Sequence, residues 1–497
     1  MSKDIFQVNK AGFEFDSSTS TVVEFLSPEA NRRQTHLTLI LGANGTSKSR
    51  VLASLVERIC QIRSEWHDDL TLRRGGDANQ HGLRCTKVVT TLNGEVSENQ
   101  PERQPNGRNA PLALPSRILV LSNLVMDKFH FPKDNLDDQP FYNYLGVRQS
   151  TNLTTTGAAE RSVAEAVLTM ASDNERLQAF RAWTDLVFDN GRELAFAFFR
   201  LRKTEISRVL NASDRRSAVM DRINRRGGSL RAPRFPPEAI EAIAEQTVAL
   251  FEFLNSVIEV YEVPHVSPVS NSKVPVLRIS TLSAQNRKHL TKLIPNFSAA
   301  SKAGFSPWPT LCIESTPWLP FSQMSSGEQN ILSVGAKLSA YAAPGCLVAI
   351  DEPEVSLNVA WQQQYIELIR KSLAQASGSH VLIATHSPHL IASAVSRESS
   401  VVLIQKNGRE LSFTTMDANF EGWGSESVLY QVLGIPSASS FHLNRDLAIV
   451  LKHIQESGKD RKLISDFLRK ISRLDYGGIE PIELVVKEIR AYRDALG

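Results

Sequence analysis

The sequence has little cysteine, few aromatic residues and no long apolar run. Its 497 residues include 4 cysteines, Cys60, Cys85, Cys312 and Cys346, which lie far apart without Cys-x-x-Cys spacing. This spacing argues against a disulfide framework and a zinc site. No stretch approaches the roughly eighteen apolar residues of a membrane helix, and the N-terminus lacks a basic-then-apolar leader. We therefore expect a cytoplasmic protein with no membrane contact.

A strong excess of charge of one sign is also missing. The net charge is +3, and 42% hydrophobic with 22% charged residues is an ordinary globular composition. Any affinity for nucleic acid must therefore come from local clusters of charge. A chain of this length exceeds what one compact core usually holds, which predicts a main domain with a sizeable insertion or second lobe.

The segment from Cys346 to His386 organises the rest of the chain. Its apolar run ends in adjacent Asp351 and Glu352, the pattern of a buried parallel strand that presents two carboxylates at its C-terminal edge. Nucleotides bind at that edge. There Asp351 would hold Mg²⁺, and Glu352 would polarise the water that attacks a γ-phosphate. The alternative is an acidic turn after a core strand, which a lone pair would favour.

Residues 36–41, HLTLIL, predict a strand that leads into a glycine-rich loop and then a helix, as in a P-loop. The glycines would turn backbone N–H groups toward phosphate, Lys48 would reach the β and γ oxygens, and Ser49 would offer a hydroxyl to Mg²⁺. Ser47 stands where such loops carry glycine, which predicts crowding or an unfavourable backbone angle. We predict ATP binding, with slow hydrolysis, by Gly42, Ala43, Asn44, Gly45, Thr46, Ser47, Lys48, Ser49 and Arg50.

Helical periodicity from about Ala158 to Leu254 predicts a second lobe inserted into the first. Within it, a basic segment at 200–234 contains eleven basic and three acidic residues, which makes it a candidate track for a phosphate backbone. The alternative is a solvated helical face followed by a flexible glycine loop. No aromatic residues are interleaved to read single-stranded sequence. The basic residues are Arg200, Arg202, Lys203, Arg208, Arg215, Arg216, Arg222, Arg225, Arg226, Arg231 and Arg234.

The stretch MSSGEQ, at residues 324–329, precedes a helical pattern, NILSVGAKLSAYA. A serine-rich turn that opens a helix is an anion-binding N-terminus. Within one subunit it has no phosphate to bind, which implies a second subunit. The alternative is an ordinary serine cap of the helix.

Together these elements resemble the ABC-type ATPase head shared by SMC and RecF-like proteins. GANGTSKS is similar to the Walker A loop except at Ser47, MSSGEQ to the signature, CLVAIDEP to the Walker B strand and THSP to the switch-histidine loop. The resemblance implies a homodimer or higher homo-oligomer that encloses ATP, with His386 sensing the γ-phosphate. It differs where the loop after RILVLS lacks a glutamine and where Asn358 replaces an aspartate. The residues acting in trans would be Ser325, Ser326, Gly327 and Glu328.

The SNLVMDKF loop, the YNYLGVR segment and the compact insertion are similar to small bacterial antiphage defence ATPases such as the PtuA component of Septu and retron systems. This narrower resemblance implies a separate HNH-type nuclease partner, PtuB-like, and in retrons a reverse transcriptase with its RNA–DNA product. The tail after His386 is too short and too helical for the Toprim nuclease domain of the related OLD proteins. We expect no cleavage of nucleic acid by this chain itself.

The sequence thus predicts an α/β fold, a P-loop ABC-type ATPase head with a mixed sheet, antiparallel edge strands, a helical insertion and a helical C-terminal tail. Its catalytic residues would be Lys48, Glu352 and His386, acting on ATP with Mg²⁺. The function would be control of a partner nuclease in antiphage defence. The alternatives are an ATP-bound scaffold or sensor with little turnover and a RecF- or SMC-like DNA-repair ATPase. The expected divisions are 1–157, 158–265, 266–415 and 416–497.

Overall fold

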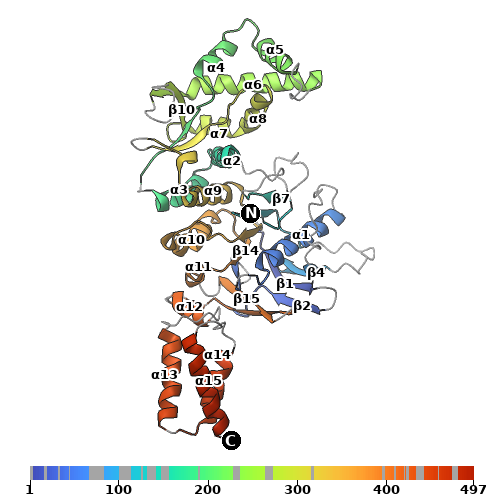
Figure 1. Ribbon diagram of the computed structural model, residues 1–497. Helices are drawn as coiled ribbons and strands as arrows, with labels where there is room; N and C mark the ends of the chain where they lie inside the picture. The colour runs from blue at the N-terminus through green and yellow to red at the C-terminus, as the bar shows by residue number, and fades with distance from the viewer. Residues whose placement is uncertain are drawn as a thin grey trace.

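Three β-sheets organise the described part of the chain, and helices extend from both ends of the region that contains the largest of these sheets. In Figure 1 the insertion lies at one end, the nucleotide motifs in the middle and the C-terminal helices at the opposite end. This is a computed structural model, which describes residues 4–15, 19–31, 34–43, 45–66, 83–99, 113–124, 127–130, 141–146, 156–188, 191–227, 235–262, 273–314, 318–394, 398–407, 410–418, 420, 425–431, 441–456, 458–472 and 480–496.

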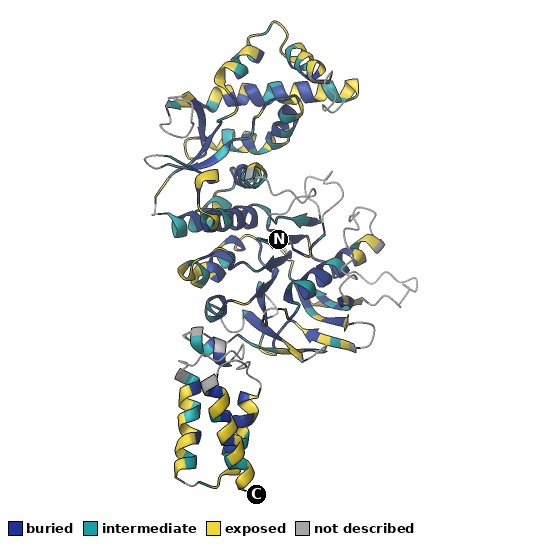
Figure 2. Ribbon diagram, in the orientation of Figure 1, coloured by how far each residue is buried: buried dark blue, intermediate teal, exposed yellow. Residues whose placement is uncertain are grey.

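The seven-stranded sheet has the order β16-β15-β3-β14-β13-β6-β7. All residues of its four central strands are buried, in keeping with near-continuous apolar runs covered on both faces (Figure 2). These strands are parallel, whereas β16 pairs antiparallel with β15, so the predicted mixed sheet is confirmed. The strands are β3 (His36–Leu41), β6 (Ile118–Ser122), β7 (Tyr142–Tyr144), β13 (Leu347–Asp351), β14 (His380–Thr385), β15 (Ser399–Asn407) and β16 (Glu410–Asp417).

A four-stranded antiparallel sheet covers one side of this core. Its order is β2-β1-β4-β5, and β1 pairs antiparallel with β2, in keeping with the antiparallel edge strands that the sequence predicts. Apolar residues of α1 pack between this sheet and the seven-stranded sheet in one buried cluster, so the helix that follows the glycine loop is fixed on two sides. The elements are β1 (Phe6–Phe15), β2 (Thr19–Glu24), α1 (Lys48–Trp66), β4 (Leu83–Leu92) and β5 (Glu95–Asn99).

The insertion contains a sheet that the sequence analysis did not predict. Its order is β12-β11-β8-β10-β9. The segment around residues 194–197 was expected to be helical, but it forms β8, whose short apolar run fits a buried strand between two neighbours as well as a helix. The strands are β8 (Leu194–Ala197), β9 (Glu259–Glu262), β10 (Lys273–Arg278), β11 (Thr310–Ile313) and β12 (Leu319–Pro320).

Strands β10 and β11 were expected to belong to the ATPase lobe after residue 265. Both pair with β8, so they lie in the sheet of the insertion. We propose that the insertion extends from residue 158 to about Pro320. Its helices are α2 (Thr156–Thr169), α3 (Asn174–Val187), α4 (Lys203–Leu210), α5 (Arg215–Gly227), α6 (Pro237–Val257), α7 (Ala284–Lys292) and α8 (Ile294–Lys302).

The remaining helices divide between the flank of the seven-stranded sheet and the tail. The tail has its own apolar core, formed by side chains of α12 to α15, and extends away from the sheets in Figure 1. The predicted helical tail is confirmed. No described helix is both long and apolar enough to cross a bilayer. The elements are η2 (Phe321–Gln323), α9 (Ser326–Tyr341), α10 (Val359–Ser372), α11 (Pro388–Ala392), α12 (Ser425–Gln431), α13 (Phe441–Gln455), α14 (Arg461–Ile471) and α15 (Glu480–Ala495).

Trp183 of α3 joins the insertion to the ATPase lobe. Its side chain is fully buried, its Nε1 donates to Ser372 Oγ at 2.8 Å, and its ring meets Tyr365 edge-on at 5.4 Å. A Cβ added to Gly335 of α9 would lie 2.4 Å from Cγ of Trp183. Glycine at position 335 is therefore what allows α9 and α3 to approach this closely.

Gly335→Ala should lower the free energy of unfolding by about 1–3 kcal/mol, because the added methyl group overlaps a buried indole. The matched control is Gly157→Ala in α2, where a Cβ meets nothing within 4 Å. That change should be neutral or slightly stabilising, because alanine favours helix. Urea unfolding followed by circular dichroism compares the two. Equal effects would contradict the close packing at Gly335.

Candidate nucleotide-binding site

The parallel register brings the nucleotide motifs to one edge of the seven-stranded sheet. Leu41, the last residue of β3, lies opposite Thr385 of β14. Asp351, the last residue of β13, lies between Ala384 of β14 and Ser122 of β6. The glycine loop, the acidic pair and the histidine loop therefore begin side by side, as the sequence analysis predicted for a nucleotide site at the carboxyl ends of strands.

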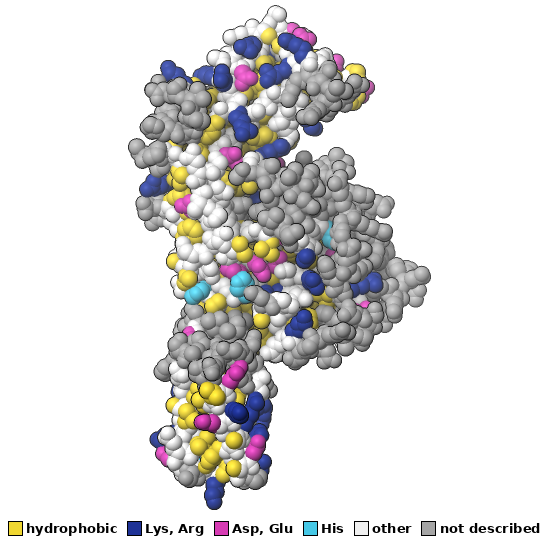
Figure 3. Space-filling view, viewed as in Figure 1, with side chains coloured by type: hydrophobic (Ala, Val, Ile, Leu, Met, Phe, Trp, Pro, Cys, Tyr) yellow, Lys and Arg dark blue, Asp and Glu magenta, His cyan; other side chains and the backbone are white. Residues whose placement is uncertain are grey.

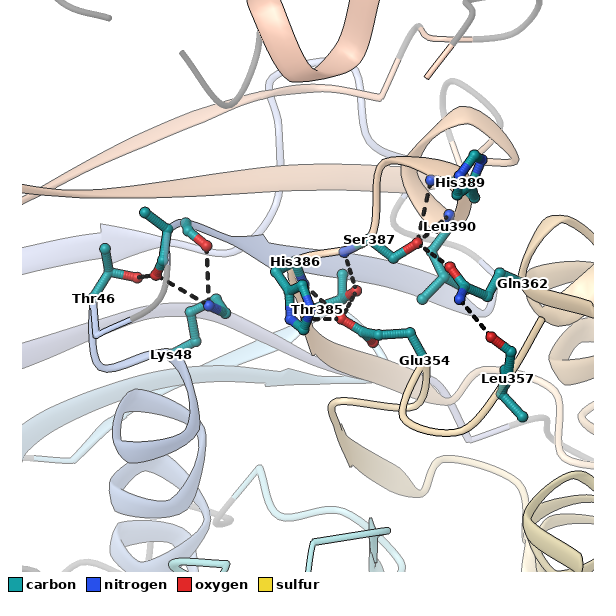
Figure 4. A network of polar contacts seen from close by, with 12 residues as sticks. Thr46, Lys48, Glu354, Leu357, Gln362, Thr385, His386, Ser387, His389 and Leu390 are labelled. Carbon is teal, nitrogen blue, oxygen red and sulfur yellow. Dashed lines mark hydrogen bonds and ion pairs between the residues drawn. The ribbon is translucent and has the colours of Figure 1, made fainter. Parts of the chain in front are cut away.

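Lys48 opens α1 and folds back over the glycine loop. Its Nζ donates to the carbonyl oxygens of Gly42 at 2.9 Å and Ala43 at 3.3 Å, as Figure 4 shows. Burial lowers the pKa of Lys48, while the carboxylates of Glu352, Glu354 and Asp351 raise it. The lysine is therefore held at the loop by carbonyl groups that a phosphate would replace. Asn44 lies outside the described residues.

The glycine-rich loop has no room for a side chain at Gly42. A Cβ at Gly42 would lie 2.4 Å from Oγ1 of Thr46 and 2.7 Å from the carbonyl oxygen of Ile404. Thr46 Oγ1 donates to the carbonyl of Ala43 at 2.8 Å, which closes the loop on itself. Glycine at position 42 is therefore a packing requirement of the loop.

The sequence predicted either crowding or an unfavourable backbone angle at Ser47, and the structure has the unfavourable angle. The φ of Ser47 is 69°, in the left-handed region that glycine occupies without cost. Two further non-glycine residues near the same edge also have positive φ, Glu352 at 46° and Ser356 at 67°. Such residues typically cost about 1–3 kcal/mol each and cluster at functional sites.

Ser47→Gly should raise the free energy of unfolding by about 0.5–1 kcal/mol, because relief of the left-handed strain outweighs the extra chain entropy of glycine. The same change should tighten ATP binding, since the loop no longer holds a Cβ in this conformation. Ser47→Ala is the matched control, because alanine keeps the Cβ and the strain. Urea unfolding and ATP titration measure both effects, and an equal gain in Ser47→Ala would contradict the argument.

Asp351 is fully buried at the end of β13. Burial raises its pKa to about 7, the nearby hydroxyl of Ser49 lowers it, and the carboxylates of Glu352, Asp127 and Glu354 raise it. Although Ser49 is close enough for this effect, neither Asp351 oxygen has a partner at hydrogen-bonding geometry within the described ranges. Unpartnered buried carboxylate oxygens beside a hydroxyl fit the hard oxygen ligands that Mg²⁺ prefers.

Glu354 is a site residue that the sequence analysis missed. It is 7% exposed, and its Oε1 accepts from Oγ1 of Thr385 at 2.8 Å and from the backbone N–H of His386 at 2.7 Å. The same oxygen lies 3.0 Å from Nδ1 of His386 (Figure 4). Glu354 thus joins the acidic strand end to the switch histidine. The signal was a third acidic residue two positions after Glu352.

Asp127 lies in the loop after β6, where the sequence shows no glutamine. It is 5% exposed, accepts from the backbone N–H of Phe129 at 3.1 Å and accepts a short hydrogen bond from the hydroxyl of Tyr144. Through this contact the YNYLG segment holds Asp127 in place, which no sequence pattern predicted. The carbonyl of Leu145 in turn accepts from the buried Nζ of Lys337 in α9 at 2.7 Å. The segment connects the acidic edge to α9.

The predicted signature forms the start of α9. Ser325 is its N-cap: Oγ accepts from the backbone N–H of Glu328, and the backbone N–H of Ser325 donates to Glu328 Oε2 at 2.6 Å. The cap alternative therefore holds, and it does not exclude phosphate binding by the exposed Ser325 and Ser326. A Cβ on Gly327 would lie 2.5 Å from the carbonyl oxygen of Ser356, so α9 packs tightly against the turn before α10.

Asn358 has a capping role that an aspartate could fill equally well. It is the N-cap of α10, and its Oδ1 accepts from the backbone N–H of Trp361 at 2.9 Å. Gln362, one turn into the helix, accepts from Oγ of Ser387 at 2.5 Å and donates to the carbonyl of Leu357 at 2.9 Å. These contacts connect the start of α10 to the histidine loop, as Figure 4 shows.

Part of the charge in the basic segment is neutralised by α6. Arg215 pairs with Glu252 at 2.5 Å and Arg216 with Glu245 at 2.9 Å, two acids that a count within 200–234 omits. Arg222 donates to the carbonyl of Gly304. Basic side chains still gather on the insertion in Figure 3. The exposed ones without such pairs in the described residues are Arg200, Arg202, Lys203, Arg208 and Arg225, while 228–234 and the Arg226 side chain are outside the description.

A known protein family matches part of this chain. Residues 158–392 match the family model described as "AAA domain, putative AbiEii toxin, Type IV TA system". The chain contains an AAA-type ATPase domain. This match includes the signature, Asp351, Glu352 and His386, whereas the glycine loop precedes it. The predicted P-loop ATP hydrolase class is therefore confirmed.

A stretch of 98 residues is 31% identical to the Septu protein PtuA of Bacillus thuringiensis, and it covers 19% of this chain and 24% of that protein. The match thus spans about a quarter of that relative. One similar solved structure is an Smc head domain with an extended coiled coil bound to the C-terminal domain of ScpA from Pyrococcus furiosus (TM-score 0.31, 12% identity, 83% of this chain, 97% of that chain). Another is the ADP conformation of an ABC-transporter ATP-binding cassette (TM-score 0.29, 10% identity, 86% and 96%).

Proposed function

We propose that this protein is an ATPase of bacterial antiphage defence that binds ATP between two heads, hydrolyses it slowly and thereby controls a partner nuclease. The observation that carries the proposal is the convergence of Lys48, Asp351, Glu352 and His386 at one sheet edge. The partial identity to Septu PtuA supports the defence setting. An HNH-type nuclease, and in a retron a reverse transcriptase with its RNA–DNA product, are the proposed partners.

Each residue has a defined task in ATP hydrolysis. The glycine loop and Lys48 bind the phosphates, and Glu352 orients and deprotonates the attacking water. His386, held by Glu354, contacts the γ-phosphate. Ser49 and Asp351 would hold Mg²⁺, which neutralises charge on the phosphates when bound. Strain at Ser47 and Glu352 favours slow turnover, since both must keep left-handed backbones while the phosphates bind.

Glu352→Gln should retain ATP but lower turnover at least about a hundredfold, because the amide cannot accept the proton of water. The matched control is Glu367→Gln on the exposed face of α10, which should turn over ATP like the parent. Phosphate release and equilibrium ATP binding provide the two measurements. Parent-level turnover in Glu352→Gln would remove Glu352 as the base. No turnover in the parent would instead favour the ATP-bound scaffold.

The pairing of two heads rests on the start of α9. Ser325 and Ser326 are exposed at a helix N-terminus, and the phosphate site of the same chain is formed by other residues. The phosphate they contact would then belong to a second copy of the chain, and this places the signature of one head on the nucleotide of the other.

Ser325→Asp should abolish ATP-dependent assembly, because aspartate still caps α9 but repels the phosphates of the partner. Fold stability should stay close to that of the parent, which separates this effect from unfolding. Gln285→Arg, an exposed change on α7, serves as the control. Light scattering with ATP in the Glu352→Gln background reads out assembly. An ATP-induced oligomer unchanged in Ser325→Asp would rule out the trans contact.

A further inference from the structure

A cavity in the insertion is lined by none of the nucleotide-motif residues. Its volume is about 570 Å³, and it lies between residues of α2, α8, β10, β11 and η2. Cavities of roughly 300–1,000 Å³ are typical of small-molecule sites. The cavity is therefore large enough for a nucleotide.

Cationic and aromatic groups line this cavity together. The guanidinium of Arg161 lies 4.5 Å from the ring centre of Trp308 and donates to Oγ of Ser298 at 3.1 Å. Arg200 is exposed at the rim, and no carboxylate in the described ranges pairs with either arginine. Phe199 contributes an apolar surface. The exposed guanidinium of Arg200, and that of Arg161 held beside the Trp308 ring, match the phosphate and the base of a nucleotide.

The lining of the cavity also includes a residue with an unpaired donor and one carboxylate. Nε1 of Trp308 is buried and has no hydrogen-bond partner among the described residues, although buried donors are almost always paired. This nitrogen is sealed from solvent, so a ligand in the cavity would reach it only after the indole ring moved. Glu160 is the single acidic residue of the lining and offers an acceptor for a ribose hydroxyl or a base amino group.

The cavity adjoins the exposed part of the basic segment. Phe305 lines it and also lines a second cavity of about 470 Å³, which Arg208 and Arg225 border. Arg222 lies over the Phe305 ring at 4.0 Å. A strand whose terminal nucleotide occupied the first cavity could continue along these arginines, whereas a free nucleotide would need only the first cavity.

The wall of the cavity leads directly into the signature. Ser322 and Gln323 of η2 line it, and Ser325 caps α9 two residues later. The backbone N–H of Met324 donates to the carbonyl of Phe321 at 3.2 Å, which makes this connection short and continuous. A ligand that contacts η2 would therefore shift or hold the start of α9.

We propose that this cavity binds a phosphorylated nucleotide, through Arg161 and Arg200 with the aromatic wall, and transmits its occupancy through η2 to the signature helix. The ligand is either a free nucleoside monophosphate or the phosphorylated 5′ terminus of a strand, which share this chemistry. The transmission to α9 rests on the proposed pairing of heads, whereas the binding itself is independent of it.

The test uses the full chain saturated with a non-hydrolysable ATP analogue, so that the glycine loop is filled. Calorimetry with dTMP, and anisotropy with labelled dT10 that has or lacks a 5′ phosphate, measure binding to the cavity. Arg161→Gln and Arg200→Glu should each weaken the phosphorylated probe roughly tenfold or more. Lys288→Glu, an exposed change on α7 outside both the basic segment and the cavity lining, is the matched control.

Binding of dTMP identifies a free nucleotide as the ligand, and preference for 5′-phosphorylated dT10 without dTMP binding identifies a strand terminus. Both outcomes support the site if Lys288→Glu leaves the phosphate preference intact. Binding of neither probe, or equal affinity in parent, Arg161→Gln and Arg200→Glu, would overturn it. Because affinity for the ATP analogue is measured separately and depends on Lys48, failure here is distinguishable from failure of the ATPase proposal.

Discussion

The parallel register of β3, β14 and β13 is the constraint on which the site depends. Strand pairing sets the ends of these strands level, so residues from distant parts of the sequence meet without any long side chain having to reach. The strands are buried on both faces, and a slip by one residue would turn every apolar side chain to the opposite face. Packing of the core thus fixes the geometry of the phosphate site.

Glu354 and Asp127 extend this constraint beyond the strands. Glu354 places His386 through both its backbone and its ring, and Asp127 is held by Tyr144 at the other side of Asp351. Burial raises the pKa of Asp351 most, and the charges of Glu352, Asp127 and Glu354 raise it further. The acidic residues near Asp351 favour a cation at this edge, whereas Lys48 favours a phosphate.

The sequence allowed the motif-bearing parts of the fold to be predicted, because each motif combines an apolar run with a turn of unusual composition. β3, β13 and α9 follow this rule. β8 did not, since a run of four apolar residues fits a helix or a strand equally well and only pairing with β10 and β11 decides between them. The ion pairs of Arg215 and Arg216 with α6 also escaped prediction, because a local count of charge omits acids that folding brings close.

Among the described residues, the apolar core of the C-terminal helices shares no member with the cores of the sheets, although Val428 of α12 packs in one of those cores. Cooperativity of folding comes from shared buried contacts, so a unit with its own core can open while the rest stays folded. Heat or denaturant should then melt this chain in steps. The backbone amides of the tail then exchange their hydrogens with solvent at a rate set by opening of the tail, independently of the sheets.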